Sequence, residues 1–274
     1  GISKSTALPQ QALMEKFIEN IKNKDALWES RSKTIPEVSH WRNLKINRDG
    51  DVVEINWKKD KRGLLIGSLD FLWLPQTVQT CTVSSKGMKG KLDGSVLPED
   101  LLVLDLSMNK LTGRIHMKQL PRKLRTLNLR KNSFSGALDL ESLPKTLEEL
   151  ILPSNRFSGS VCLTKLPPAL RDLNLAFNQL SGSIDRTQLP QTLESVSFRE
   201  NTFSGLLDFS SVPPSLREIS LNYNNFEGET DFSNLTPPGL ILNVAYTKLS
   251  GTFVLSKGGG QHVSVDGSNV EVVS

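Results

Sequence analysis

The chain of 274 residues is poor in the features that mark enzymes and membrane proteins. It has three histidines, and it lacks the G-x-S-x-G, H-E-x-x-H and P-loop spacings of common catalytic and phosphate-binding motifs. No apolar run approaches the roughly 20 residues that span a bilayer. The net charge of +4 is small, and charges of both signs are intermixed. We therefore expect no catalytic activity, no transmembrane segment and no nucleic-acid partner.

What the sequence does contain is one frame that recurs every 23 residues between Val78 and Leu255. The frame reads L-x-x-L-x-L-x-x-N-x-[FL]-x-G-x-[LIV]-x-[LF]-x-x-L-P. A fixed period of 20–50 residues is typical of stacked repeat proteins. The eight copies begin at Val78, Leu101, Leu124, Leu147, Leu170, Leu193, Leu216 and Gly239.

The columns of this frame predict local structure. The fourth and sixth positions are apolar and alternate with polar ones, as in Leu104 and Leu106, which indicates a strand with one buried face. Leu138-Asp139-Leu140 alternates again, which predicts a second short strand on the opposite side. The Leu-Pro step that closes each copy leaves no room for a long convex helix. We expect coils that stack in parallel around one continuous core.

Two further columns predict turns. An asparagine occupies the ninth position of the six inner copies, where its amide is suited to satisfy backbone groups of a buried turn. A glycine at the thirteenth position of every copy predicts positive φ or close backbone approach. The asparagine column is Asn109, Asn132, Asn155, Asn178, Asn201 and Asn224.

These elements resemble the leucine-rich repeat family, in particular the short, plant-like repeats of protist (kinetoplastid-type) proteins. Asn132-Ser133-Phe134-Ser135-Gly136 and Asn155-Arg156-Phe157-Ser158-Gly159 carry the resemblance, which covers about residues 52–256. It implies a mainly β, right-handed solenoid with a curved parallel sheet, little convex helix and a helical N-terminal cap. It also implies a protein or peptide ligand on the concave face.

The two ends depart from the frame. Residues 8–24 have apolar side chains at helical spacing after Pro9, and Val52–Trp57 reads as a strand. We therefore expect an N-terminal cap at 1–77, eight repeats at 78–256 and a C-terminal cap or tail at 257–274.

The two cysteines bear on the compartment. Cys81 and Cys162 lie three coils apart, or roughly 14 Å at 4.8 Å per strand. A disulfide needs Cα atoms within about 7 Å, so the two cannot pair. The N-terminal region also lacks the cysteine pair that is usual in the family's cap. These points favour an intracellular location, with an extracellular or cell-surface location as the alternative.

The eighth position of each copy should face outward on the concave strand, and in three copies it is an aromatic residue, Phe177, Tyr223 or Tyr246. Exposed tyrosines are typical of interfaces. The alternative is that these rings pack on one another or on the coil edge. With their polar neighbours they predict a partner-binding set: Met108, Arg130, Lys131, Phe177, Arg199, Glu200, Tyr223 and Tyr246.

Two charged columns are interpreted as structural. Arginine and glutamate alternate at the second position, which predicts ion pairs between stacked coils. Aspartates recur at the sixteenth position, but one carboxylate per coil supplies too few of the six to eight oxygens that calcium needs. We expect no metal and no cofactor. These aspartates are Asp139, Asp185, Asp208 and Asp231.

The sequence therefore predicts a non-catalytic, monomeric scaffold that binds a protein or peptide. Two alternatives stay open. The chain is a cell-surface or secreted recognition protein for a glycan or adhesion ligand, or it is the docking arm of a larger enzyme.

Overall fold

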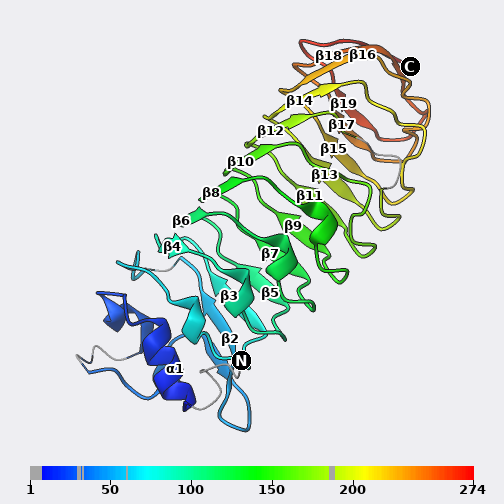
Figure 1. Cartoon of the computed structure of the whole chain (residues 1–274). Coiled ribbons are helices and arrows are strands. Elements are labelled where there is room, and N and C mark those ends of the chain that lie inside the picture. The colour runs from blue at the N-terminus through cyan, green and yellow to red at the C-terminus, as the bar shows by residue number, and fades with distance from the viewer. Residues whose placement is uncertain (1–7, 30–31, 33, 60, 185–188) are drawn as a thin grey trace.

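The strands form because each coil buries one apolar face only by stacking on its neighbours. The computed structural model describes residues 8–29, 32, 34–59, 61–184 and 189–274. Within these residues the chain forms a parallel β-solenoid with two sheets that run along its length (Figure 1). No helix of the described residues is long and apolar enough to cross a bilayer.

The eleven-stranded sheet has the order β1-β2-β3-β5-β7-β9-β11-β13-β15-β17-β19. Strand β1 pairs with β2 antiparallel, and the remaining pairs are parallel. The repeat strands span only the third to fifth positions of the frame. The bounds are β1 Leu44–Ile46, β2 Val52–Trp57, β3 Thr80–Val83, β5 Val103–Asp105, β7 Thr126–Asn128, β9 Glu149–Ile151, β11 Asp172–Asn174, β13 Ser195–Ser197, β15 Glu218–Ser220, β17 Ile241–Asn243 and β19 His262–Ser264.

The nine-stranded sheet lies on the other side of the core and has the order β20-β18-β16-β14-β12-β10-β8-β6-β4. Strands β6 to β18 begin at the tenth position, directly after the asparagine column or, in the last copy, after Thr247. The bounds are β4 Lys89–Lys91, β6 Lys110–Gly113, β8 Ser133–Gly136, β10 Arg156–Gly159, β12 Gln179–Gly182, β14 Thr202–Gly205, β16 Asn225–Glu229, β18 Lys248–Val254 and β20 Asn269–Val273.

The predicted second strand at Leu138–Leu140 is therefore wrong in position. The strand of that coil is β8, and Leu140–Ser142 forms the 3-10 turn η7 instead. The Leu-Pro step that follows makes only a short turn possible here, because the coil must close within 23 residues. The other 3-10 turns are η2 Lys24–Leu27, η3 Val38–His40, η4 Phe71–Trp73, η5 Gly94–Val96 and η6 Met117–Gln119.

The core is one continuous cluster from Met14 to Val270. The glycine column has positive φ as predicted, and Gly251 shows why a side chain is excluded there. Its φ is 125°, and an added Cβ would overlap the backbone oxygen of Thr230. Glycine at this position lets adjacent coils approach at backbone distance.

Helix α1 Gln10–Phe17 lies beside β2 at the N-terminal end of the stack (Figure 1). The Phe17 ring is fully buried and stacks on Trp57 at 6.1 Å between centroids, and Trp41 lies 6.5 Å beyond. The Nε1 of Trp57 donates to the carbonyl of Arg42 at 3.0 Å, so burial leaves no indole N–H of this ring unsatisfied. The strand predicted at Val52–Trp57 is β2.

The asparagine column forms a ladder between coils. Asn155 is 8% exposed, and its Nδ2 donates to the carbonyls of Leu129 and Leu152 at 2.9 and 3.1 Å. Its Oδ1 accepts from the backbone N–H of Phe134 at 3.1 Å. The same pattern recurs at the other ninth-position asparagines. Each amide thus holds its own turn and the turn of the preceding coil, as the sequence predicts.

Candidate functional site

The eighth position of the repeat lies in the turn between the two sheets. It follows the end of each eleven-sheet strand by three residues, so the prediction that it sits on the concave strand is wrong. The turn also demands left-handed backbone: eight non-glycine residues here have φ between 50° and 59°. They are Ser85, Met108, Lys131, Ser154, Phe177, Glu200, Tyr223 and Tyr246. Bulky residues rarely adopt this conformation, which costs roughly 1–2 kcal/mol relative to the right-handed region.

Three members of this column are aromatic, and together with Arg199 from the seventh position they form a row that we call the ring stack: Phe177, Arg199, Tyr223 and Tyr246. The two tyrosine rings are nearly parallel, at 4.4 Å between centroids and 11° between planes. The Arg199 guanidinium lies 5.0 Å from the Phe177 ring and 5.7 Å from the Tyr223 ring. Sequence reasoning left open whether these rings pack on one another or stay available. They do both, because Phe177, Tyr223 and Tyr246 remain 40%, 43% and 52% exposed.

The far end of the ring stack rests on backbone. Gly267 occupies the equivalent turn of the last coil with φ 67°, and an added Cβ would lie 2.9 Å from Cδ1 of Tyr246. The glycine therefore makes room for the tyrosine ring.

The structure brings only part of the predicted set together. Glu200 joins the ring stack through its 3.1 Å ion pair with Arg199. Met108 is 47% exposed and lies in the same column nearer the N-terminus, where its sulfur accepts from Ser85 Oγ at 3.3 Å. Arg130 and Lys131 are exposed one coil further along. These three side chains share the edge with the ring stack but do not contact it.

The outward face of the eleven-stranded sheet carries an acidic row that sequence reasoning did not assemble. Glu149 and Asp172 occupy neighbouring strands in register, and Glu218 follows after Ser195. Burial and then the charges of Glu149 and Glu218 raise the pKa of Asp172 from 3.8 to about 6. A basic group placed over this row would favour the ionised carboxylate.

The residues at the fifth and seventh positions of the frame together stabilise the turn that leads to the eighth position. Asn128 Oδ1 accepts the backbone N–H two residues on, at Arg130, at 3.1 Å. Three other coils repeat this bond from Asp105, Asn174 and Asn243. Where the fifth position is Ile151, which offers no acceptor, the seventh is Pro153, which has no N–H. The sequence thus contains a readable signal for this turn.

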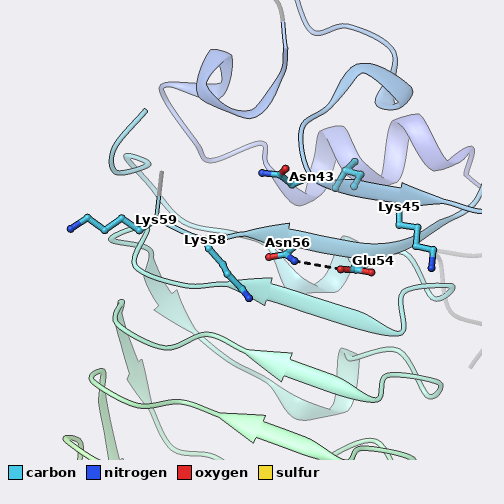
Figure 2. A pocket seen from close by; sticks show the side chains of 7 residues that line it. Asn43, Lys45, Glu54, Asn56, Lys58 and Lys59 are labelled. Carbon is cyan, nitrogen blue, oxygen red and sulfur yellow. Dashed lines mark hydrogen bonds between the residues drawn. The ribbon is translucent and has the colours of Figure 1, made fainter. Parts of the chain in front are cut away.

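At the N-terminal end of the same sheet a cavity of about 350 Å³ is lined by Asn43, Leu44, Lys45, Glu54, Asn56, Lys58 and Lys59. Figure 2 shows Lys45 and Lys58 on opposite sides of the Asn56–Glu54 pair, with Lys59 extending away from them. Asn56 Nδ2 donates to Glu54 Oε1 at 3.5 Å. Sequence reasoning missed this cavity, because its residues come from irregular coils outside the repeat frame.

A second hollow of about 580 Å³ lies beside the ring stack. It is lined by Asn178, Gln179, Glu200, Asn201, Thr202 and Tyr223. This edge of the solenoid therefore combines a polar hollow with the stacked aromatic rings.

The remaining charged columns are structural. Arg125 pairs with Glu148 at 2.9 Å and Arg171 with Glu194 at 2.8 Å, all four side chains being more than a third exposed. Such pairs contribute little, about 0–1 kcal/mol. The sixteenth-position aspartates accept local bonds, as Asp231 does from the N–H of Ser233 at 2.8 Å. Asp185 lies outside the described residues, and within those residues no cluster of metal-ligating side chains occurs.

Comparisons with known proteins place the fold. No family model matches the sequence, and no curated protein matches it. Among solved structures the PEPR1–AtPEP1 crystal structure has a TM-score of 0.66 at 22% identity, and the match covers 96% of this chain and 42% of that one. A plant membrane receptor kinase LRR ectodomain, GASSHO1/SCHENGEN3 from Arabidopsis thaliana with CASPARIAN STRIP INTEGRITY FACTOR 2, has a TM-score of 0.66 at 19% identity, covering 96% and 36%.

A plant ice-binding protein matches over 97% of both chains, with a TM-score of 0.63 at 19% identity. These likenesses show a leucine-rich repeat solenoid fold. The chain spans less than half the length of the two receptor structures.

Proposed function

We propose that this chain is a non-catalytic scaffold that binds a protein or peptide on its concave, eleven-stranded sheet and along the edge where the ring stack lies. The contacting side chains are Met108, Arg130, Lys131, Phe177, Arg199, Glu200, Tyr223 and Tyr246. The observation that carries the proposal is the exposed ring stack on left-handed backbone. The receptor ectodomain found in complex with CASPARIAN STRIP INTEGRITY FACTOR 2 supports it as a structural analogue.

The physical argument is that the fold does not require these side chains. The coils accept serine at the same position, since Ser85 and Ser154 have φ 56° and 59°. Placing tyrosine or phenylalanine there costs backbone strain and leaves apolar surface exposed. Strain retained at particular residues points to function, and tyrosine and arginine are the side chains that dominate interface energies. A rigid stack also avoids the entropy of ordering these groups on binding.

The test is a triple variant, Phe177→Ser, Tyr223→Ser and Tyr246→Ser, which keeps a residue that the turn already tolerates. A matched control replaces three exposed residues of the nine-stranded sheet, Lys110, Arg156 and Lys248, with serine. A partner isolated with the wild-type chain is expected to bind the triple variant at least tenfold more weakly and the control within twofold. Equal binding to all three proteins would remove the ring stack from the site.

Several finer points belong to the same proposal. The chain acts as a monomer, in a right-handed solenoid whose residues 1–77 cap the N-terminal end and whose residues 257–274 cover the last coil. A secreted or cell-surface recognition role for a glycan or adhesion ligand is the main alternative. A docking arm within a larger enzyme is the second. Detection of the native protein in a secreted or cytosolic fraction separates the first alternative from an intracellular scaffold.

A second candidate function rests on the nine-stranded sheet. Hydroxyl side chains occupy the outward twelfth position of five consecutive strands, at Thr112, Ser135, Ser158, Ser181 and Ser204. Each of these residues pairs with the tenth position of the next strand, so the row repeats once per coil. A periodic hydroxyl row presents regular hydrogen-bond partners to ordered water, and the ice-binding structural neighbour makes ice a candidate ligand. Ice recrystallisation assays test this. Replacing Ser158 and Ser181 with lysine should abolish any activity, and an inactive wild-type chain eliminates the candidate.

A further inference from the structure

The N-terminal cavity gathers positive charge at the end of the eleven-stranded sheet. Lys45 lies on β1 opposite Glu54 of β2. Lys58 and Lys59 follow β2 just as Ser84 and Ser85 follow the neighbouring strand β3. Lys45 therefore lies at the N-terminal end of the sheet face that carries the acidic row, and Lys59 lies at the start of the edge that carries the ring stack.

Three lysines line this cavity. Within the described residues, no ion pair involves Lys45, Lys58 or Lys59. The one carboxylate in the cavity, Glu54, already accepts a hydrogen bond from Asn56. Lys45 and Lys58 flank the single carboxylate of the described lining, and Lys59 extends from the rim of the cavity (Figure 2). The described lining of this cavity of about 350 Å³ is therefore net positive and open to an anionic group.

One residue of the cavity, Lys59, lies on the same edge as the ring stack. Lys59 corresponds to Ser85 in the eighth-position column, which continues through Lys131 to Phe177. Between β2 and β11 the sheet order has five steps, which at about 4.8 Å per strand amounts to roughly 24 Å. An extended peptide advances about 3.3 Å per residue, so about seven residues bridge the two sites.

We propose that the partner is a polypeptide with an acidic segment, whose aspartate or glutamate side chains bind Lys45, Lys58 and Lys59, placed about seven residues from the segment that covers the ring stack. This inference rests on the proposed function and specifies the chemistry of its partner. Charge complementarity carries it, because ammonium groups around an open cavity raise the local concentration of anions. Ammonium groups are flexible point charges, which suits clustered carboxylates.

The experiment uses the full chain and fluorescein-labelled peptides, measured by anisotropy at 50 and 150 mM salt. The probe carries four consecutive glutamates in a glycine-serine background, and matched peptides carry four glutamines or four lysines. The glutamate probe is expected to bind at least tenfold more tightly than the glutamine peptide at 50 mM salt. The difference should shrink at 150 mM, where the Debye length is about 8 Å.

Matched variants locate the binding. Replacing Lys45, Lys58 and Lys59 with glutamine should weaken glutamate-probe binding at least tenfold. Replacing Lys89, Lys110 and Lys248 of the nine-stranded sheet with glutamine removes the same charge and should change binding less than twofold. Circular dichroism and thermal melting confirm that each variant folds. Equal losses in both variants, or a wild-type chain that prefers the lysine peptide, overturn the inference.

Two further arms separate the competing explanations. Inorganic phosphate at matched ionic strength should compete weakly, and displacement of the probe by millimolar phosphate would show a phosphate site instead. The triple-serine variant of the ring stack should keep wild-type affinity for the glutamate probe, because the lysines lie roughly 24 Å away. A partner that binds the triple-serine variant as tightly as the wild-type chain would refute the proposed function without changing the result with the glutamate probe. The two failures are therefore distinguishable.

Discussion

Replacing Asn155 with alanine removes one rung of the asparagine ladder and takes one hydrogen bond from each of three backbone groups. The carbonyls of Leu129 and Leu152 lose one donor but keep another, Asn132 at 3.1 Å and Asn178 at 3.2 Å. The N–H of Phe134 loses its acceptor. A buried polar group left unsatisfied costs about 1–3 kcal/mol. The two lost carbonyl bonds add about 0.5–1.5 kcal/mol each. We expect the free energy of unfolding to fall by about 2–4 kcal/mol, the lower half of the sum, because the alanine cavity admits some water.

The chain provides its own comparison for this variant. In the last coil Thr247 replaces the asparagine, and its Oγ1 donates to the carbonyl of Val244 at 2.7 Å within the same coil. Asn155→Thr should therefore keep the bond to Leu152 and lose the two that reach the preceding coil. The expected order of stability is wild type, then threonine, then alanine.

Urea unfolding followed by far-ultraviolet circular dichroism measures the global effect. Amide hydrogen exchange at Phe134 measures the local one, where each 1.4 kcal/mol is a tenfold faster exchange when local opening is affected. A loss below about 1 kcal/mol for the alanine variant would refute the claim that these turns are closed to water. Equal losses for threonine and alanine would refute the assignment of the hydroxyl bond.

Three other outcomes follow from the structure. Lys131→Asn should raise the free energy of unfolding by about 1 kcal/mol, because asparagine tolerates the left-handed backbone; thermal melting measures this, and no gain for asparagine or an equal gain for alanine contradicts it. Asp172→Asn should stabilise the protein above pH 6 but not near pH 4: the folded pKa is raised to about 6, so ionisation destabilises the native state as pH rises from 4 to 6. Urea titrations at both pH values check the sign, and a larger benefit at pH 4 contradicts it. A thiol reagent at pH 8 should label one cysteine in the native chain and two after unfolding, because Cys162 is exposed while burial raises the pKa of the Cys81 thiol to about 12; rapid native labelling of both would show that Cys81 is accessible.

The scaffold was predictable because every inner coil presents the same surroundings to the same column. The structural roles of Asn155 and Gly251 recur from coil to coil, so the 23-residue spacing alone identifies both residues. The positions of the strands were harder to predict from the sequence. The nine-stranded sheet falls at the tenth to thirteenth positions, where glycine weakens a simple alternating pattern. Short strands that pair only by stacking leave little propensity signal of their own.

The candidate site was harder to predict than the scaffold. Phe177, Tyr223 and Tyr246 were selected by their exposure, but their backbone geometry was hidden because residues of every size occupy that column. Gly267 carries the missing signal, yet it sits in a coil of different length and falls outside the 23-residue frame. The cationic cavity depends on the antiparallel strand β1, whose partner no repeat pattern specifies.

The direction of the asparagine ladder has a mechanical consequence. Each rung reaches back toward the N-terminus, so a coil is secured by the one that follows it, and Thr247 makes its bonds within its own coil. The N-terminal end is anchored separately by the packing of Phe17 on Trp57. When the molecule is pulled by its two ends, the C-terminal coil should unfold first, and the other coils should follow one at a time toward the N-terminus.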